Sequence, residues 1–554
     1  MTRTFAEANP RPKTSAAPRG VGAARRHDRW SWAVVAVGSV MYLIHYLGGR
    51  ALWLDEAMIA LNIRHLSFAE LAGKLDYNQM APVGWSYIEK VAFNLFGDLE
   101  YGLRLWPVLA AIAALVLFRQ LAFRLLSGFG ALAAVVLFAG NGALVRYAAE
   151  VKPYSTDVML SVAAMLTAAM IITDGPVKAW RFAAFALVGL AAVFLSFSAV
   201  YVLAAAGTVV FLHFALQKRW ALTAATAAVG LAWLIVFGVL MLKVYMPQLA
   251  GSDLVEGAAA DFFEETSYAP LAPRGFDNLV WYARWTEDLL DFLFRREAWF
   301  PAAILIGVGI LARLRQWRFL ALALAPLGLG LIGSGLELYP LYERLVLFAA
   351  PGLLLVAGAG VAWFVGVSRG SIVAPAAMVV MVLLGSAPYL VGGLLKARPS
   401  FAQHNVHPGL ERLKAQAKPE DIIYVTNSTI PAYLLYRQAY GLQGRRWIAG
   451  KTPLYSWDCF INEMPRTAHP QRIWVLFSAN LTEDWKARPS ATDLAEDGRS
   501  GQFKLDVAAP SAWLYHAETA ALPGQPLSLG APCSVDPLAN RFDVPKRLGQ
   551  RAGA

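Results

Sequence analysis

The sequence predicts a polytopic α-helical membrane protein with about 11 transmembrane helices and a small C-terminal α/β extracytoplasmic domain. Hydrophobic residues form 57% of the 554 residues and charged residues only 16%, whereas soluble domains have roughly 45–50% and about 25%. The mean hydropathy of +0.46 indicates more apolar surface than one water-soluble core could bury. Apolar segments of bilayer-spanning length also recur from residue 32 to residue 395. These observations exclude a disordered, collagenous or disulfide-dense chain.

Residues 1–31 form a basic tail that we expect to lie in the cytoplasm. The net charge of +11 is concentrated in this tail and in short connectors between apolar segments. A nucleic-acid-binding protein would gather its basic residues in one soluble groove, so no nucleic acid partner is predicted. Residues 32–49 lack a convincing small-residue cleavage site, and we interpret them as a retained first span rather than a signal peptide.

Residues 32–395 are predicted to form one transmembrane domain, because a helix needs about 20 apolar residues to cross a bilayer. The candidate spans are residues 32–49, 104–124, 127–146, 156–173, 181–197, 199–216, 221–245, 300–314, 318–336, 345–367 and 372–395.

The connectors between these spans predict the orientation of the chain in a cell (inner) membrane. If the N-terminus is cytoplasmic, every connector on the cytoplasmic side carries Lys or Arg, as basic residues prefer the inner face. These residues are Arg119 and Arg124, Lys178 and Arg181, Lys218 and Arg219, Arg313, Arg315 and Arg318, and Arg369. An odd number of spans then places residues 396–554 on the extracytoplasmic side.

The connectors on the extracytoplasmic side are of a different kind. They are residues 50–103, 146–154, 196–198, 247–298 and 339–344. The two long ones are expected to cover a site, and the short ones mix charged, polar and aromatic residues. The middles of the spans contain almost no ionisable residue apart from His45 and His213, which we interpret as packed structural residues. Candidate chemistry therefore gathers at one membrane face.

The C-terminal residues 396–554 alternate between helical and strand-like patterns. Residues 421–425 and 472–477 are predicted strands, residues 511–516 are a further candidate, and a helix is expected near residues 431–440. The only two cysteines, Cys459 and Cys533, lie here and could form a disulfide in an oxidising compartment. The sequence has no P-loop, HExxH motif or CxxC pair.

Asp55 and Glu56, directly beyond the first span, are the first candidate site. Two adjacent acids at the border of a bilayer need water or a partner, since a charge costs about 2.5–3.5 kcal/mol at the bilayer centre. A carboxylate there could act as a general base toward a hydroxyl or bind a divalent metal. The alternative is a structural role, in which the acids stabilise the N-terminus of the next helix.

Two further candidate sites lie in short connectors on the same face. The segment from Arg146 to Tyr154 combines cations and aromatic rings at headgroup level, which suits a phosphate whose lipid tail stays in the membrane. In the segment from Tyr339 to Arg344, the arginine could donate two parallel hydrogen bonds to a phosphate. The alternative for each is an ordinary aromatic belt with basic residues at the interface.

These segments resemble motifs of the GT-C superfamily of membrane glycosyltransferases. Residues 147–154 match the pattern Tyr-x-x-Glu-(Ala or Val)-(Arg or Lys)-x-Tyr of the protein O-mannosyltransferase, aminoarabinose transferase and rhizobial galacturonosyltransferase branch, which is like glycosyltransferase family 39. The remaining matches are Asp55-Glu56, residues 78–82, residues 95–105, and residues 342–345 with Pro351. The resemblance covers residues 32–395, and it implies a fold of GT-C type.

The resemblance implies transfer of a sugar, with inversion, from a polyprenyl-phosphate donor to an acceptor hydroxyl on a glycolipid, polysaccharide or protein. Asp55 would be the general base, and Glu56 would orient it or bind the acceptor. The implied roles of the remaining residues are donor-phosphate binding by Lys152 and Arg344, and substrate binding by Tyr147, Glu150, Tyr154, Tyr339 and Glu343. No cofactor is implied with certainty, and a divalent metal stays open.

The sequence departs from the family at one motif, and other functions stay open. Met80 and Ala81 stand where many members have His-Pro, so the identity of the donor sugar is left open. A lipid or glycan transporter is one alternative, although transporters place ionisable groups near the bilayer midplane. A non-catalytic assembly protein on a degenerate transferase fold is another.

Overall fold

The computed structural model describes residues 19–97, 99–174, 177–249, 268–271, 275–368, 370–395, 405–450, 471–476, 503–509 and 512–517. Arg369, Cys459 and Cys533 lie outside these described residues, as does part of the long connector 247–298.

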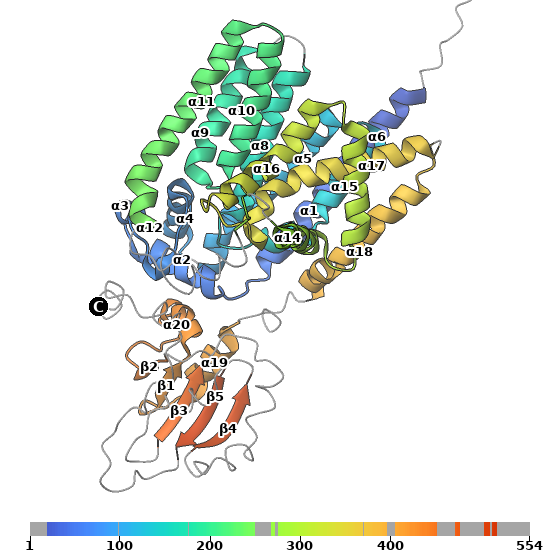
Figure 1. Ribbon diagram of the computed structural model, residues 1–554. Coiled ribbons are helices and arrows are strands. Elements are labelled where there is room, and N and C mark those ends of the chain that lie inside the picture. The colour runs from blue at the N-terminus through green and yellow to red at the C-terminus, as the bar shows by residue number, and fades with distance from the viewer. Residues whose placement is uncertain are drawn as a thin grey trace, which may run out of the picture.

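A bundle of apolar helices forms most of the described structure (Figure 1). Its members are α1 (Arg19–Leu47), α5 (Leu99–Leu125), α6 (Gly128–Ala139), α7 (Gly142–Tyr147), α8 (Tyr154–Thr173), α9 (Ala179–Leu195), α10 (Ala199–Leu216), α11 (Trp220–Leu240), α15 (Trp299–Arg313), α16 (Trp317–Gly335), α17 (Ala350–Val367) and α18 (Val373–Leu395). Within the described ranges, seven helices are long and apolar enough to cross a membrane, and four shorter apolar helices accompany them. Each predicted span coincides with helical structure, which confirms a polytopic α-helical membrane fold.

One predicted span, residues 127–146, is broken into two helices. The break lies at Gly140 and Asn141, between α6 and α7. The Asn141 side chain accepts a hydrogen bond from the Leu144 amide, so it caps a new helix in place of continuing the old one. The Asn141 amide also donates to the Leu293 carbonyl at 2.8 Å, which ties the break to α14 (Phe276–Phe294).

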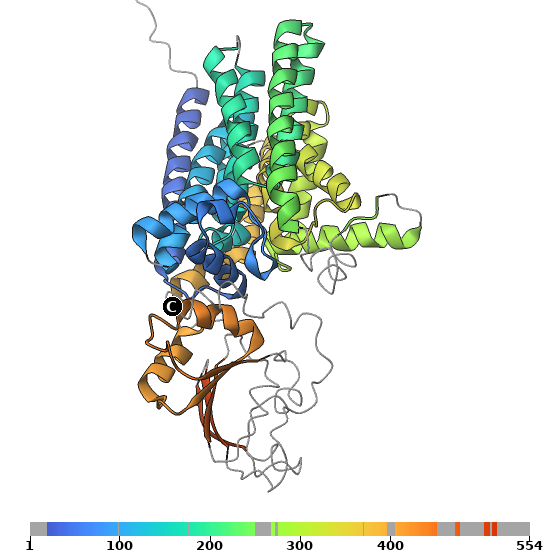
Figure 2. The same ribbon diagram turned by 90° about the vertical axis from the view of Figure 1, so that its left-hand side faces the viewer.

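The connectors that were predicted on the extracytoplasmic side contain helices that the hydropathy pattern alone did not predict. The segment 50–103 folds into α2 (Leu54–His65), α3 (Phe68–Leu71), the 3₁₀ helix η1 (Asp76–Asn78) and α4 (Val83–Phe96). A π-helix η2 (Met241–Tyr245) and α12 (Met246–Leu249) extend α11, and the 3₁₀ helix η3 (Glu343–Ala349) precedes α17. Figure 2 shows α14 lying crosswise to the bundle helices.

The C-terminal region contains a five-stranded sheet in the order β2-β1-β3-β5-β4. Its strands are β1 (Ile422–Val425), β2 (Trp447–Ala449), β3 (Gln471–Leu476), β4 (Phe503–Ala509) and β5 (Ala512–Ala517). β1 pairs in parallel with β2 and β3, whereas β5 pairs antiparallel with β3 and β4. The two predicted strands and the further candidate correspond to β1, β3 and β5, while β2 and β4 were not predicted. The helices here are α19 (His407–Gln416), η5 (Asn427–Thr429) and α20 (Ile430–Tyr436).

The C-terminal region packs against the end of the bundle that carries α2 (Figure 1). The Leu52 amide donates to the Tyr436 hydroxyl at 2.9 Å, and Arg64 donates to the Leu435 carbonyl at 3.0 Å. The His407 Nε2 atom lies 2.6 Å from the Glu100 carboxylate. These contacts fix the chain just before Asp55, so the sheet region supports the candidate site.

Candidate active site

Asp55 and Glu56 lie in the first turn of α2, where acidic side chains interact favourably with the helix dipole. The Trp53 amide donates to the Glu56 carboxylate at 3.2 Å, which satisfies a backbone donor at the helix start. The two acids are adjacent in sequence, but their side chains enter different surroundings.

The Glu56 side chain is completely buried and held by an extensive set of donors. Arg104 donates to it through Nε at 3.1 Å and Nη2 at 2.7 Å, and the Val151 amide donates at 2.9 Å. Arg50 Nη2 lies 3.8 Å away. Burial opposes ionisation, but the charges of Arg104 and Arg50 and these hydrogen bonds outweigh it and hold the pKa of Glu56 below its usual value. This geometry favours orientation of the site over direct binding of an acceptor.

Asp55 is partly exposed and forms an ion pair with Arg344. The Arg344 Nη2 atom lies 2.7 Å from Asp55 Oδ2, and each side chain retains about a quarter of its exposure. Arg344 is at the start of η3, so this contact joins two regions 289 positions apart. The guanidinium group also lies 5.4 Å from the Trp53 ring and 5.9 Å from the Tyr154 ring. Both aromatic rings therefore help to hold the arginine.

Lys152 comes from the turn between α7 and α8 and lies in the same cluster of charges. Its Nζ donates to the Gln79 amide oxygen at 2.8 Å. Burial lowers the pKa of Lys152, and the positive charge of Arg344 adds to this, while the negative charge of Asp55 opposes it. The structure thus brings Asp55, Lys152 and Arg344 together at one end of the bundle, as the sequence predicted.

Glu150 lies in the same turn, and its carboxyl group is 2% exposed. Within the described structure, its Oε1 atom is buried without a hydrogen-bond partner. Burial and the nearby charge of Glu56 raise the pKa of Glu150 to about 7, despite the opposing charges of Arg50, Arg344 and Arg146. A buried carboxyl oxygen without a donor is suited to accept a hydrogen bond from a ligand hydroxyl.

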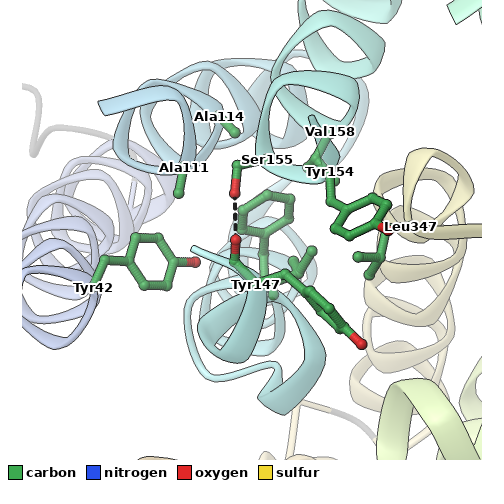
Figure 3. A pocket seen from close by; sticks show the side chains of 10 residues that line it. Tyr42, Ala111, Ala114, Tyr147, Tyr154, Ser155, Val158 and Leu347 are labelled. Carbon is green, nitrogen blue, oxygen red and sulfur yellow. Dashed lines mark hydrogen bonds between the residues drawn. The ribbon is translucent and has the colours of Figure 1, made fainter. Parts of the chain in front are cut away.

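The predicted aromatic residues form a packed wall beside this cluster. The Tyr147 and Tyr154 rings meet edge to face at 5.3 Å, and the Ser155 hydroxyl donates to the Tyr147 carbonyl at 2.8 Å (Figure 3). Behind them is a void of about 10 Å³, which is room for about one water molecule. Tyr339 packs against Tyr201 at 5.5 Å and donates its hydroxyl hydrogen to the Leu345 carbonyl at 3.0 Å.

A larger cavity opens beside the aromatic wall and is lined by Glu343. Its volume is about 510 Å³, and it lies between η3, α14 and the end of α7. Its charged lining residues are Arg146, Asp288, Asp291, Arg295 and Glu343. The cavity is large enough for a small-molecule substrate.

Sequence reasoning assigned no role to Arg50, Arg104 and Gln79, which hold the cluster in place. Arg104 is 1% exposed, and besides binding Glu56 it donates to the Ala51 carbonyl at 3.3 Å. Its signal in the sequence was an arginine at the start of a predicted span, which is costly in a membrane unless it is paired. Gln79 follows Tyr77 and Asn78, which adopt positive φ angles of 60° and 51°. Asparagine tolerates such an angle, but for Tyr77 it is strained, and strain of this kind is common at functional sites.

The metal expected as one option receives no ligand set from the described residues. Among them, no three His, Cys, Asp or Glu side chains cluster at a distance that could hold a metal ion. The carboxylate of Asp55 is paired with Arg344, and that of Glu56 with Arg104.

The fold has relatives among solved structures, although no family model and no curated protein matches the sequence. ArnT from Cupriavidus metallidurans in the apo state aligns with a TM-score of 0.52 and 13% identity, over 91% of this chain and 99% of that chain. The same protein bound to undecaprenyl phosphate gives a TM-score of 0.50 and 14% identity with the same coverage. An Archaeoglobus fulgidus oligosaccharyltransferase in complex with Zn and sulfate is more distant, with a TM-score of 0.45 and 11% identity, over 88% of this chain and 73% of that chain.

The likeness to ArnT extends over nearly the whole chain and concerns the fold. This chain therefore shares the fold of ArnT, which agrees with the fold of GT-C type that its motifs predicted.

Proposed function

We propose that this protein is an inverting membrane glycosyltransferase that moves a sugar from a polyprenyl-phosphate donor to an acceptor hydroxyl. The observation that carries the proposal is the meeting of Asp55, Lys152 and Arg344, which supplies a carboxylate base and two cations in one site. The fold shared with ArnT, one structure of which is bound to undecaprenyl phosphate, supports a lipid-phosphate donor.

In the proposed reaction, the acceptor oxygen attacks the anomeric carbon of the donor sugar. The bond between that carbon and the phosphate oxygen breaks with inversion, and the acceptor proton passes to the Asp55 carboxylate. The polyprenyl phosphate leaves with the bonding electron pair. Lys152 and Arg344 stabilise the negative charge that develops on its oxygen in the transition state. Because the donor is already activated as a phosphate ester, the reaction needs no nucleotide.

The ion pair between Arg344 and Asp55 suggests how donor binding prepares the base. Without a phosphate, the Arg344 guanidinium occupies one oxygen of the Asp55 carboxylate through their ion pair. A donor phosphate competes for the same guanidinium group, since Arg binds phosphate through charge-assisted hydrogen bonds. Binding of the donor therefore frees Asp55 at the moment when a base is required.

The other predicted residues have supporting roles in this proposal. Glu56 orients the start of α2 through its bonds to Arg104, and Glu150 accepts a hydrogen bond from a sugar hydroxyl. Tyr147 and Tyr154 pack against the sugar or the prenyl headgroup. Tyr339 packs against Tyr201 beside these rings. Glu343 lines the 510 Å³ cavity, which is a route for the donor or acceptor.

The proposed topology places the N-terminus in the cytoplasm and the site on the extracytoplasmic face. The basic connectors around Arg124 and Arg315 support this orientation, because they line one cavity at the end of the bundle opposite Asp55. Residues 32–395 are the proposed transferase domain, and residues 396–554 are the proposed extracytoplasmic α/β domain.

The test is sugar transfer in membranes that contain the Asp55→Asn variant at the expression level of the wild type. General-base catalysis contributes about 10²- to 10⁴-fold, so we expect a loss of that size. Asp28→Asn is the matched control, because Asp28 also pairs with an arginine, Arg119, but at the other end of the bundle. Wild-type turnover by Asp55→Asn would remove Asp55 from the role of base. In a strain without the protein, we expect one polyprenyl-phosphate sugar to accumulate, and its mass identifies the donor.

A further inference from the structure

A second cavity lies at the end of the bundle opposite the candidate active site. Its volume is about 360 Å³. It is lined by Arg124, Leu125, Ile172, Thr173, Arg315, Gln316, Trp317, Arg318 and Phe319. Thr173 ends the 20-residue helix α8, whose first residue, Tyr154, belongs to the candidate active site. A helix of that length is about 30 Å long, so the second cavity has no part in sugar transfer.

The polar groups that line this cavity are mainly hydrogen-bond donors. Three lining residues are arginines, and no lining residue is acidic. Within the described structure, the Nε atoms of Arg124 and Arg318 are buried and have no hydrogen-bond partner. Asp174 pairs with the Nη1 atom of Arg124, so the Nε atom of Arg124 is left without an acceptor. Buried donors without acceptors are costly, and an anion in the cavity would satisfy them.

The start of α16 adds backbone donors to the same cavity. Gln316 occupies the N-cap position, but its side chain makes no capping hydrogen bond. The Gln316 amide oxygen instead accepts a hydrogen bond from Arg313 at 2.6 Å. The first amide groups of a helix and its dipole favour an anion at this position, phosphate in particular.

The cavity lies at the level where lipid headgroups meet the helices. Trp317 lines it, and the exposed Trp180 and Trp220 lie in the first turns of α9 and α11 at the same end of the bundle. Exposed tryptophans of this kind mark the interface between bilayer and water. Leu125, Ile172 and Phe319 give the cavity an apolar side, which suits the glycerol and acyl portion of a lipid.

We propose that this cavity binds the phosphate group of an anionic membrane lipid, with Arg124, Arg315 and Arg318 as its donors. Arginines between helices on the basic side of a membrane protein are well suited to such headgroups. A soluble phosphate has the same chemistry at its charged end but would leave the apolar side of the cavity unfilled.

The experiment measures thermal unfolding of the purified full-length protein in detergent with three separate additions. These are phosphatidylglycerol, phosphatidylcholine and inorganic phosphate. We expect phosphatidylglycerol to raise the melting temperature in a saturable way and the other two to have little effect. Arg318→Gln should weaken the apparent affinity for phosphatidylglycerol by at least about tenfold, since a hydrogen bond to a charged group is lost.

The matched control is Arg29→Gln, which removes one charge at the same end of the bundle from an exposed position outside the cavity. It should bind phosphatidylglycerol as the wild type does. If Arg318→Gln does not fold, Arg315→Gln tests the same cavity from an exposed position.

Equal stabilisation by phosphatidylglycerol and phosphatidylcholine, or equal losses in Arg29→Gln and Arg318→Gln, would overturn the proposal. If inorganic phosphate raised the melting temperature and phosphatidylglycerol did not, the ligand would not be a lipid. The measurement does not involve sugar transfer, so its outcome is independent of the proposed enzymatic activity.

Discussion

Charged side chains are arranged differently at the two ends of the helix bundle. At the end that carries α2, acidic and basic side chains form ion pairs: Glu56 pairs with Arg104, and Asp55 pairs with Arg344. At the other end, arginines line a cavity that contains no acidic side chain, and two of their Nε atoms lack partners within the described residues. A phosphate at the first end must displace an existing ion pair, whereas a phosphate at the second end would supply missing acceptors.

This difference fits a reactive site at one end and a permanent binding site at the other. Ion pairs keep the side chains of a site in position before the substrate binds, and catalysis requires such preorganisation. Displacement of one ion pair then couples binding to the release of a base. Unpaired donors, in contrast, favour constant occupation by a ligand.

The largest expected effect on stability comes from Glu56→Gln. This substitution removes one partner of a fully buried ion pair and leaves the Arg104 charge uncompensated, which costs about 3–5 kcal/mol. The matched control is Asp174→Asn at the other end, where the carboxylate is 29% exposed and pairs with Arg124 and Arg181. We expect it to lose under about 1 kcal/mol. Unfolding of both purified variants measures the difference, and equal losses would contradict the contrast between the two ends.

Arg344→Ala tests whether the charges around Asp55 bind the donor. Loss of one group that stabilises the leaving phosphate should lower kcat by about 10²- to 10³-fold. The KM for the acceptor should change little, because the guanidinium group is proposed to contact the donor. Arg344→Lys keeps the charge but loses the planar fork of donors, so its loss should be smaller. Steady-state kinetics with both substrates varied give these values, and an equal effect on donor and acceptor would argue against a phosphate contact.

The titration of Glu150 predicts how stability depends on pH. Its pKa of about 7 in the folded protein lies above the usual value of 4.5, because burial opposes its charge. The folded state then holds a proton that the unfolded state has lost, so stability falls as pH rises from about 4.5 to about 7. The contribution is up to about 3 kcal/mol. Melting temperatures across this range should fall less for Glu150→Gln than for the wild type, and parallel profiles would contradict the assignment.

Much of the fold could be predicted because the positions of membrane helices depend on local composition. The apolar segments predicted the bundle, and the mixed polar connectors predicted that charged and aromatic side chains gather at one end of it. The helices of residues 50–103 escaped prediction, since short amphipathic segments have weak periodicity. The strand β2 was missed because a strand of three residues is specified by its pairing partner more than by its own sequence. The seven-residue strand β4 was also missed, and its length does not explain this.

Sequence motifs indicated several residues of the cluster around Asp55 but not the pairings among them. The motifs around Asp55, Lys152 and Arg344 were visible in the sequence, yet no pattern reveals that Arg344 pairs with Asp55 across 289 positions. The sequence also does not reveal that the adjacent side chains of Asp55 and Glu56 point in different directions. Glu56 turns toward Arg104 inside the protein, and Asp55 toward Arg344 in a more open place, because tertiary packing decides the direction of each side chain.

The smallest expected effect concerns the C-terminal support of α2. Tyr436→Phe removes the acceptor of the buried Leu52 amide and should cost about 1–3 kcal/mol of stability. Tyr433→Phe, on the same helix, is the matched control. Within the described structure its hydroxyl is buried without a partner, so its removal should be neutral or stabilising. Thermal unfolding measures the loss of stability in each variant, and the decisive result is which of the two variants loses more. If Tyr433→Phe were the more destabilising variant, α20 would stabilise the start of α2 by packing alone, and the Leu52 contact would not help to position Asp55.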